Sequence, residues 1–455
     1  MTSAILRVVS PDMPPKGERW HRQILGHEYF APAQWRRRVA LWSGGILVGL
    51  AAIAFARGSD IAFATFQSMV RANAWLPFVV TPAVFAAIAA LTSGKLRQTR
   101  GSGIPQVIAA IELEDRDLRH RLLSVPVTLG KMALTLFGLA GGASIGREGP
   151  TIHVGAGLMY WVGRRMGFTD PKALSRFILA GGGAGIAAAF NAPLAGIVFA
   201  IEELAGSFEQ RVSGIILTAV IFAGVVSLGL LGDYAYFGRV DAHLQLGQGT
   251  LAVLLCGIGG GIGGGVFVRL IMLSPRGPLA RIEACRRHWP ILFAGVCGLL
   301  LAVLGMVSGT SVFGTGYDEA RGLIQATHGG NSTFWLFKVS ANVLSYWAGI
   351  PGGIFSPALA VGAGMGHALA ALLPGIDQSA VALLGMAAFL AGVTQTPLTA
   401  AVISLELTAN HSMVIPLLAV TLLARGLSSL VCHVPVYRAF ADRIIVEHRQ
   451  SKSGT

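Results

Sequence analysis

Residues 146–157 of the chain read GREGPTIHVGAG, and residues 353–364 read GIFSPALAVGAG. Six of the twelve aligned positions are identical, and the two segments lie 207 residues apart. A second pair follows in the same order at a spacing of 204, with PLAGIVFAIE at 193–202 and PLTAAVISLE at 397–406. The chain therefore contains an internal repeat. In membrane proteins such repeats indicate a transporter-type fold, with a site where broken helices of both halves meet.

The two glycine-rich motifs have the features of helix N-termini. Each ends a glycine-rich stretch and carries a proline, Pro150 or Pro357, near the start of the apolar run that follows. Helix N-termini present free N–H groups and the positive end of the helix dipole, so they bind anions. The repeat therefore predicts that residues 146–150 and 353–357 form two halves of one site, and that the ligand is an anion.

The composition is that of a membrane protein. Of the 455 residues, 53% are hydrophobic and 13% are charged, and the mean hydropathy is +0.64, whereas a soluble chain carries about 25% charged residues. The 60 glycines indicate closely packed helices. These values exclude a disordered protein and argue against a cytosolic enzyme. We interpret the net charge of +13 as basic cytoplasmic loops rather than a nucleic-acid surface, because no nucleic-acid-binding motif accompanies it.

The apolar runs are irregular in length. A simple membrane span needs about 20 apolar residues, but the runs at 132–146 and 149–163 are shorter and the run at 339–376 is too long for one helix. This irregularity predicts broken or re-entrant helices, whose loosened backbone must be buried in protein or line a cavity. The sequence therefore predicts an all-α integral membrane protein.

Four regions are expected along the chain. They are a cytoplasmic N-terminal segment at 1–34, a first membrane repeat at 35–232, a second at 233–440 and a short cytoplasmic tail at 441–455. The three consecutive arginines at 36–38 precede the first apolar run, so the positive-inside rule places the N-terminus in the cytoplasm. The short tail leaves no room for a C-terminal regulatory domain.

Three motifs together carry a resemblance to a known family. GSGIP at 101–105, GREGP at 146–150 and GGIFSP at 352–357 occur in this order, and Tyr437 follows in VPVY. Together they resemble the CLC family of chloride channels and transporters, over roughly residues 35–440. The resemblance implies a homodimer with one pore per subunit. Each subunit would consist of two inverted-topology repeats of tilted and re-entrant helices.

The resemblance also implies how a central chloride is bound. Ser102 would direct its hydroxyl, and Tyr437 its phenol, at the same ion. The backbone N–H groups of Ile354 and Phe355 would complete this site. Because these ligands are dipoles rather than full charges, they would bind the ion firmly enough to replace water and weakly enough to release it.

A second, outer ion and the gate are implied at the GREGP motif. The N–H groups from Arg147 to Gly149 would help to bind the outer ion. Glu148 would be the gate, because its carboxylate is itself an anion and can occupy the chloride position while it is ionised. Protonation would remove that competition, so the same residue would gate chloride and carry a proton. An intramembrane acid is a functional hypothesis by default.

Glu203 bears on whether the protein is an exchanger or a channel. It matches the family's internal proton-transfer glutamate, which channels of the family usually lack, and so favours proton-coupled chloride/proton antiport. A passive voltage- or pH-gated chloride channel on the same fold remains the alternative. By the same resemblance, Ser102 favours chloride over nitrate, since relatives that prefer nitrate carry proline there. The short tail resembles the bacterial members, which suggests a bacterial inner membrane.

Each of these residues also has an ordinary structural interpretation. Glu148 could be a solvated loop acid, and Glu203 could be an acid at a cytoplasmic helix end, as its neighbour Glu202 suggests. Ser102 could cap a helix, and Tyr437 could belong to an aromatic belt at the membrane surface.

A role outside transport is weakly supported. An intramembrane serine hydrolase using Ser308 would need a nucleophile–base pair, and no histidine is compellingly placed for one. The histidines and cysteines lack metal-ligand spacing. We therefore expect no enzyme, no metal and no cofactor, with chloride, protons, the lipid bilayer and a second copy of the chain as partners.

Overall fold

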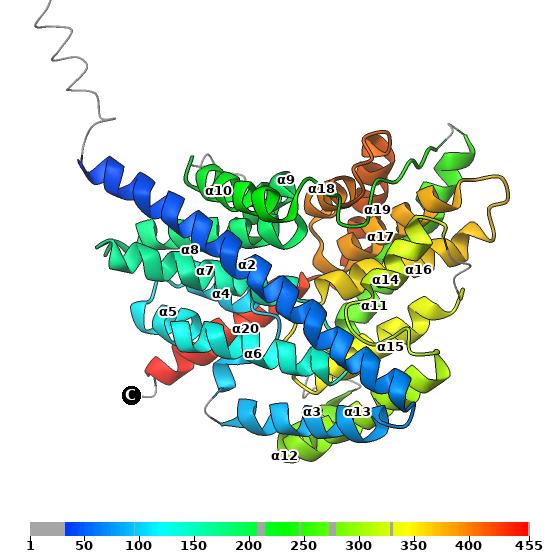
Figure 1. Ribbon diagram of the computed structural model, residues 1–455, viewed down its shortest axis with the longest axis horizontal. Coiled ribbons are helices and arrows are strands. Elements are labelled where there is room, and N and C mark those ends of the chain that lie inside the picture. Colours follow the sequence, from blue (N-terminus) through cyan, green and yellow to red (C-terminus); the bar gives the residue numbers. More distant parts are fainter. Residues whose placement is uncertain are drawn as a thin grey trace, which may run out of the picture.

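The computed structural model describes a helical protein (Figure 1). It describes residues 32–453 apart from 95, 207–213, 245–246, 273–278 and 328–330. Most of the N-terminal segment expected at 1–34 therefore lies outside the described residues. Within them, the only extended pairing is an isolated antiparallel bridge between Gly146 and Gly353. The all-α prediction is thus confirmed.

The first half contains helices α2 to α10. Their bounds are α2 Pro32–Ala72, α3 Pro77–Ser93, α4 Ile104–Glu112, α5 Arg116–Leu123, α6 Val125–Ala140, α7 Glu148–Arg165, α8 Pro171–Phe190, α9 Pro193–Phe199 and α10 Gly214–Leu231. A 3₁₀ turn at Arg97–Thr99 precedes α4, and a π-helical segment at Ala200–Ala205 continues α9.

The second half contains helices α11 to α20. Their bounds are α11 Gln248–Ile271, α12 Ala280–His288, α13 Pro290–Val307, α14 Tyr317–Ile324, α15 Phe334–Trp347, α16 Phe355–Ala370, α17 Gln378–Thr394, α18 Pro397–Thr408, α19 Val414–Val431 and α20 Val436–Ser453. The long apolar run at 339–376 is split between α15 and α16, which confirms the prediction of broken helices.

The two halves repeat the same local structure. Helices α8 and α17 begin after Asp170 and Asp377, whose carboxylates each accept a backbone N–H bond of the first turn. Both helices end at a residue in the left-handed conformation, Asn191 (φ 53°) and Gln395 (φ 60°). An apolar helix that starts with proline follows each of them, α9 or α18. These equivalent pairs support the internal repeat read from the sequence.

Reciprocal contacts show that the halves are related by a two-fold rotation. The Glu202 carboxylate accepts hydrogen bonds from the N–H groups of Leu398 (3.2 Å) and Thr399 (2.6 Å) at the start of α18. The Glu406 carboxylate accepts them from Leu194 (3.0 Å) and Ala195 (2.6 Å) at the start of α9. Each half supplies the acid that caps a helix of the other half. Such reciprocal contacts arise when two repeats are related by a two-fold rotation and not by a translation along the chain. This exchange fits the inverted-topology repeats.

Close helix pairs form the interior of each half. Helix α7 packs along α8, and α16 packs along α17. A Cβ placed on Gly181 would collide with the backbone of Gly155, and one on Gly362 would lie 2.5 Å from the Gly385 oxygen. These glycines therefore let helix backbones touch, which accounts for part of the glycine excess.

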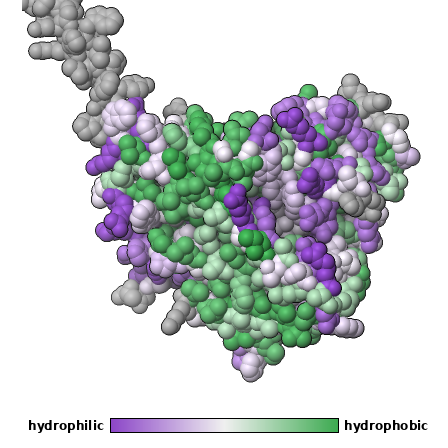
Figure 2. Space-filling model, viewed as in Figure 1, coloured by the Kyte–Doolittle hydropathy of each residue, from purple (hydrophilic) through white to green (hydrophobic). Residues whose placement is uncertain are grey.

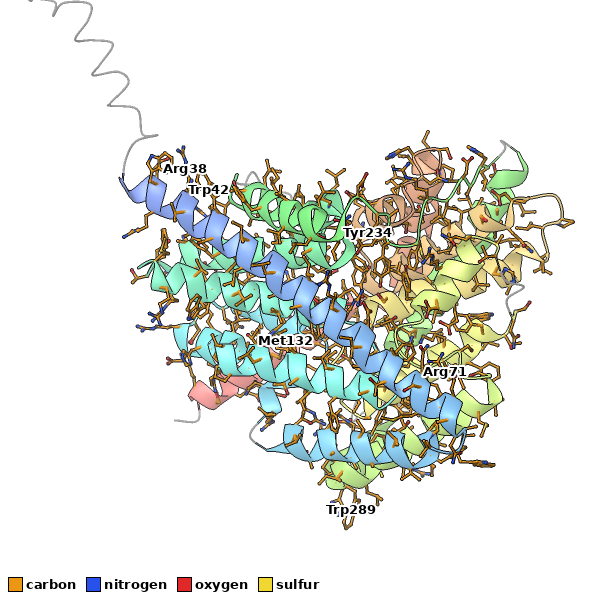
Figure 3. The ribbon with its side chains drawn as sticks, viewed as in Figure 1. Arg38, Trp42, Arg71, Met132, Tyr234 and Trp289 are labelled. Atoms are coloured by element: carbon orange, nitrogen blue, oxygen red, sulfur yellow. The ribbon has the colours of Figure 1, made fainter. Side chains whose placement is uncertain are left out.

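The surface is suited to lipid. Seven helices of the described residues are long and apolar enough to cross a membrane. Large apolar side chains are exposed, among them Leu194 (60%), Leu292 (65%) and Ile415 (79%), and apolar surface is broad in Figure 2. Figure 3 shows Arg38 and Arg71 towards opposite ends of α2. This helix of 41 residues spans about 60 Å at 1.5 Å per residue, so it must be strongly tilted to cross about 30 Å of hydrocarbon.

The segment after residue 440 continues the last helix. It was expected as a short tail, but α20 runs to Ser453 and packs against α4. The Asp115 carboxylate caps α5 and pairs with Lys452 of α20. These hydrogen bonds from Lys452 and from the Leu118 N–H hold the pKa of Asp115 well below its ordinary value. The end of the chain is thereby attached to the α4–α5 corner.

Candidate anion and proton site

The GREGP and GGIFSP motifs meet at one place, as the repeat predicted. The Gly146 N–H donates to the Gly353 oxygen at 2.7 Å, and the Gly353 N–H donates back to the Gly146 oxygen at 2.7 Å. Helix α7 begins next to this bridge at Glu148, and α16 begins next to it at Phe355. Neither helix has a side-chain cap. Two helix N-termini thus converge with free first-turn N–H groups, which is an arrangement that favours an anion.

The Glu148 side chain is fully buried at this convergence. Its Oε1 accepts a hydrogen bond from the Ser356 hydroxyl at 2.5 Å, whereas its Oε2 has no partner in the described part of the chain. A Cβ on Gly146 would collide with that Oε2. The carboxylate therefore folds back over the Gly146–Gly353 bridge and lies between the two helix starts.

Ser102 lies against the first turn of α7. A Cβ on Gly149 would lie 3.1 Å from the Ser102 Oγ and 2.9 Å from its carbonyl oxygen. The Ser102 hydroxyl oxygen accepts a hydrogen bond from the Ile104 N–H at 3.3 Å, at the start of α4. The Ser102 hydroxyl thus bonds the first N–H of α4, although the N-cap residue is Gly103, and its place beside Gly149 brings the GSGIP motif to the other two. Gly103 makes the turn possible because its φ is 104°.

Tyr437 is buried in the first turn of α20, which packs against α4. Its hydroxyl has no hydrogen-bond partner among the described residues. The phenol lies within electrostatic range of both Glu148 and Glu203. A buried hydroxyl without a partner is costly. The burial of Tyr437 and its unpartnered hydroxyl fit a ligand-binding residue better than a residue of an aromatic belt at the membrane surface.

Phe355 and Ile354 form the α16 side of the site. Ile354 is the N-cap residue of α16 and Phe355 is its first residue, and both side chains are buried. The Phe355 ring packs 6.1 Å from the rings of both Phe190 and Phe199. These contacts fix the backbone at the start of α16, where its N–H groups are free.

Glu203 and Glu202 are neighbours in the chain with different surroundings. Glu202 is engaged in capping α18. Glu203 is buried in the π-helical segment, and its Oε2 has no partner in the parts of the chain that the structure describes. It interacts with the side chains of Thr396 and Arg438. Glu203 is therefore an interior acid rather than a solvated acid at a helix end.

The Arg147 side chain is directed away from the carboxylate that follows it. Its Nη1 donates to Asp60 (2.6 Å) and to the Ala56 oxygen (2.8 Å), both on α2. The guanidinium therefore anchors the start of α7 to α2. The backbone N–H groups at the start of α7 are therefore positioned by this anchor, while the Arg147 Nε has no hydrogen-bond partner in the described part of the chain.

Comparison with known proteins identifies the family. The family model described as the voltage-gated chloride channel family matches residues 84–429, which is most of the chain. The chain belongs to this family, the CLC family. It is 30% identical over 436 residues to the H(+)/Cl(-) exchange transporters ClcA of Yersinia pestis bv. Antiqua (strain Angola) and of Yersinia pseudotuberculosis serotype O:3 (strain YPIII). Each alignment covers 90% of this chain and 88% of the relative.

Solved structures share the fold of this CLC protein. A slow cyanobacterial Cl-/H+ antiporter matches with a TM-score of 0.77 and 23% identity, covering 91% of this chain and 99% of that one. A CLC-type fluoride/proton antiporter matches with a TM-score of 0.74 and 23% identity, covering 88% and 96%. At this level of identity the likeness shows the architecture only.

Sequence reasoning missed three residues at the CLC motifs. Ser356 bonds the Glu148 carboxylate, and the Tyr236 phenol interacts with Ser356. Lys131 is fully buried, and its Nζ donates to the Gly101 oxygen at 3.1 Å, which holds the loop of Ser102. A charged residue inside the apolar run around α6 was a signal that could have found Lys131. No local sequence pattern identifies Ser356 or Tyr236, because their contacts depend on the fold.

A lysine in the second half repeats this arrangement. Lys338 lies 207 residues after Lys131 and is also fully buried. Its Nζ donates to the Val312 and Gly314 oxygens, both at 2.9 Å. Gly314 precedes α14 much as Gly101 precedes α4, so both repeats use a buried lysine to hold the loop before a short helix.

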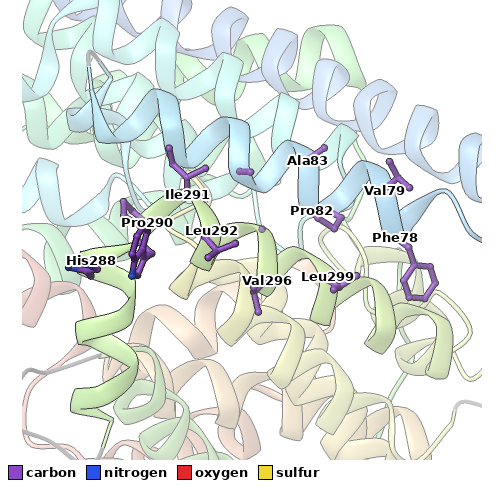
Figure 4. Close-up of a pocket in the computed structure, with 13 residues that line it drawn as sticks. Phe78, Val79, Pro82, Ala83, His288, Pro290, Ile291, Leu292, Val296 and Leu299 are labelled. Carbon is purple, nitrogen blue, oxygen red and sulfur yellow. The ribbon is translucent and has the colours of Figure 1, made fainter.

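Two cavities flank the helices in contrasting ways. A groove of 780 Å³ between α3 and α13 is lined mainly by apolar side chains, including Phe78, Pro82 and Leu292, and offers little to an ion (Figure 4). A second hollow of 350 Å³ is polar and includes Arg147 and Tyr236. The second hollow reaches the residues around the α7 start, so it is the better candidate for an entrance.

Proposed function

We propose that this CLC protein exchanges chloride for protons across a bacterial inner membrane. The observation that carries the proposal is the buried Glu148 carboxylate, which lies between two uncapped helix starts with one oxygen unpartnered in the described structure. Because the Glu148 carboxylate can occupy an anion-binding site and can also accept a proton, chloride binding and proton binding are directly coupled there. The names of the Yersinia relatives agree with this function.

The chloride ligands would be dipoles from all three motifs. The Ser102 hydroxyl, the Tyr437 phenol and the N–H groups of Ile354 and Phe355 would bind a central ion. The unpartnered Tyr437 hydroxyl and the free first turn of α16 support this assignment. The N–H groups from Arg147 to Gly149 at the start of α7 would bind an outer ion.

Glu148 would act as gate and proton carrier. While it is ionised, its carboxylate competes with chloride for the helix starts. When it accepts a proton it loses its charge, and the helix dipoles no longer favour it over chloride. Chloride then takes the place, and the neutral side chain is free to move out and release its proton on the other side.

Glu203 would pass protons between the cytoplasm and Glu148. It is buried beside Arg438 with one oxygen unpartnered among the described residues, and Tyr437 lies within electrostatic range of both acids. This arrangement favours antiport over the passive channel, since a channel needs no second interior acid.

We also propose a homodimer embedded in lipid. The exposed apolar side chains of α9 and α19, such as Leu194 (60%), Ile415 (79%) and Leu422 (53%), support a contact through these helices.

A flux experiment tests the function. The purified protein is reconstituted in liposomes, a chloride gradient is imposed and the external pH is recorded. Antiport predicts that chloride drives protons against their own gradient. Chloride flux without proton movement would instead establish the channel.

Two variants test the roles of the acids. Glu203→Gln is expected to abolish proton movement and to keep chloride flux. Glu148→Ala is expected to uncouple the two ions and to remove the pH dependence of chloride flux. Intact coupling in Glu148→Ala would refute its assignment as the gate.

A further inference from the structure

Within the described part of the chain, Ser356 is the residue whose side chain hydrogen-bonds the Glu148 carboxylate. It is the second residue of α16 and is buried, whereas Glu148 begins α7. The bond therefore joins the two repeats, which are 208 residues apart at this contact. A serine hydroxyl can donate one proton, and here that proton points to the carboxylate at 2.5 Å.

The Ser356 hydroxyl is supported from behind. The Tyr236 phenol interacts with Ser356, and its ring packs against Phe190 (5.2 Å) and Tyr317 (4.8 Å). The Tyr317 hydroxyl donates to the Tyr236 backbone oxygen at 2.7 Å. These contacts hold Tyr236, so the hydroxyl that faces Ser356 has a defined position.

We propose that Ser356, backed by Tyr236, is a positioning residue that holds the ionised Glu148 carboxylate in the anion site and so sets how readily chloride and protons displace it. This inference rests on the proposed gating role of Glu148. A hydroxyl that donates to a carboxylate stabilises the ionised form, and such charge-assisted bonds are about twice as strong as neutral ones. Ser356 therefore strengthens the competitor of chloride without binding chloride itself.

Other charged and titratable groups also face Glu148, and the Ser356 variants leave them unchanged. Arg147 adjoins it on α7 and is anchored by Asp60 of α2, and Tyr437 faces it from α20. Removing the Ser356 hydroxyl leaves these groups in place. A change in the behaviour of the gate would then report on the Ser356 hydroxyl, which bonds Glu148 and contacts Tyr236.

Chloride binding to the full-length protein in detergent is the direct test. Titration calorimetry with KCl is expected to show about ten-fold tighter binding in Ser356→Ala, the factor that about 1.4 kcal/mol makes in an equilibrium constant. Ser356→Thr keeps the hydroxyl and is expected to bind chloride like the wild type. Ser404→Ala is the matched control, because the hydroxyl of that buried serine donates to the Ala400 oxygen of its own helix.

A double variant separates the two ways in which Ser356 could act. In a Glu148→Ala background the competitor is absent, so adding Ser356→Ala is expected to leave chloride affinity unchanged. A change of the same size in both backgrounds would mean that Ser356 acts on chloride binding independently of Glu148, and would overturn the proposal. Unchanged affinity in Ser356→Ala alone would overturn it as well.

Flux provides a second readout. The pH at which chloride flux reaches half its maximum is expected to move upward by about one unit in Ser356→Ala, since the ionised gate is less stabilised. Tyr236→Phe keeps the ring and is expected to shift this midpoint in the same direction by less. An unmoved midpoint in Ser356→Ala would count against the proposal. If the wild type moved chloride without protons, antiport would fail, while the calorimetric test of Ser356 would still stand.

Discussion

Replacing Glu202 by Gln distinguishes the roles of two acids that are adjacent in the chain. The Glu202 carboxylate caps α18, accepting from the Leu398 N–H (3.2 Å), the Thr399 N–H (2.6 Å) and the Thr399 hydroxyl (2.8 Å). Glu203 has an oxygen with no partner in the described structure. We therefore expect Glu202→Gln to lower stability and to keep proton coupling, whereas Glu203→Gln is expected to abolish proton coupling.

The magnitude follows from the bonds that the amide cannot make. The remaining carbonyl oxygen of glutamine can keep the two bonds of Thr399, but its NH₂ group would face the Leu398 N–H. One bond to a charged acceptor is lost and the others lose their charge assistance, at a net cost of about 2–4 kcal/mol. For a chain of 455 residues, an unfolding entropy of about 2.1 cal/mol/K per residue converts this into a fall in Tm of about 2–4 °C.

The two-fold relation provides a matched control. Glu406→Gln removes the equivalent cap from α9, where Leu194 and Ala195 donate to it. Thermal unfolding in detergent is expected to show similar falls in Tm for Glu202→Gln and Glu406→Gln, and liposome assays are expected to show coupled flux in both. Loss of proton coupling in Glu202→Gln at an unchanged Tm would refute the assignment of Glu202 as a structural cap.

Four further variants test the scaffold by the same unfolding assay. Gly362→Ala places a Cβ 2.5 Å from a backbone oxygen of α17 and is expected to cost about 1–3 kcal/mol, whereas Gly229→Ala, with no atom within 4 Å, is expected to be tolerated. Lys338→Met removes the buried donor from the backbone oxygens before α14 and is expected to lower Tm by about 1–3 °C; an unchanged Tm would contradict its role. Because Lys452 lowers the pKa of Asp115 below the unfolded value of about 3.9, the stability that Asp115 contributes is present above about pH 4 and is lost as pH falls further. Asp115→Asn should therefore lose less Tm than the wild type between about pH 6 and pH 3, and equal losses would argue against the pairing.

Local patterns in the sequence were sufficient for the class, the repeat and the helix starts at the site. Low charge and high hydropathy indicate a membrane protein, because a bilayer does not solvate charged side chains. Glycine followed by a proline near position 150 or 357 indicates a helix N-terminus, because that signal depends only on neighbouring residues. The three motifs with Tyr437 also indicated the family that the comparisons established.

Contacts between segments some 200 residues apart were decided by the tertiary structure alone. The bond from Ser356 to Glu148 and the exchange of caps between Glu202 and Glu406 depend on how the two halves rotate onto each other. No residue in either segment carries a local signal of its partner in the other. The sequence by itself determined that two anion-favouring helix starts exist. The repeat also predicted that these helix starts form one site, but only the packing of the repeats decided that they meet through the Gly146–Gly353 bridge and that Ser356 of the second repeat bonds Glu148 of the first.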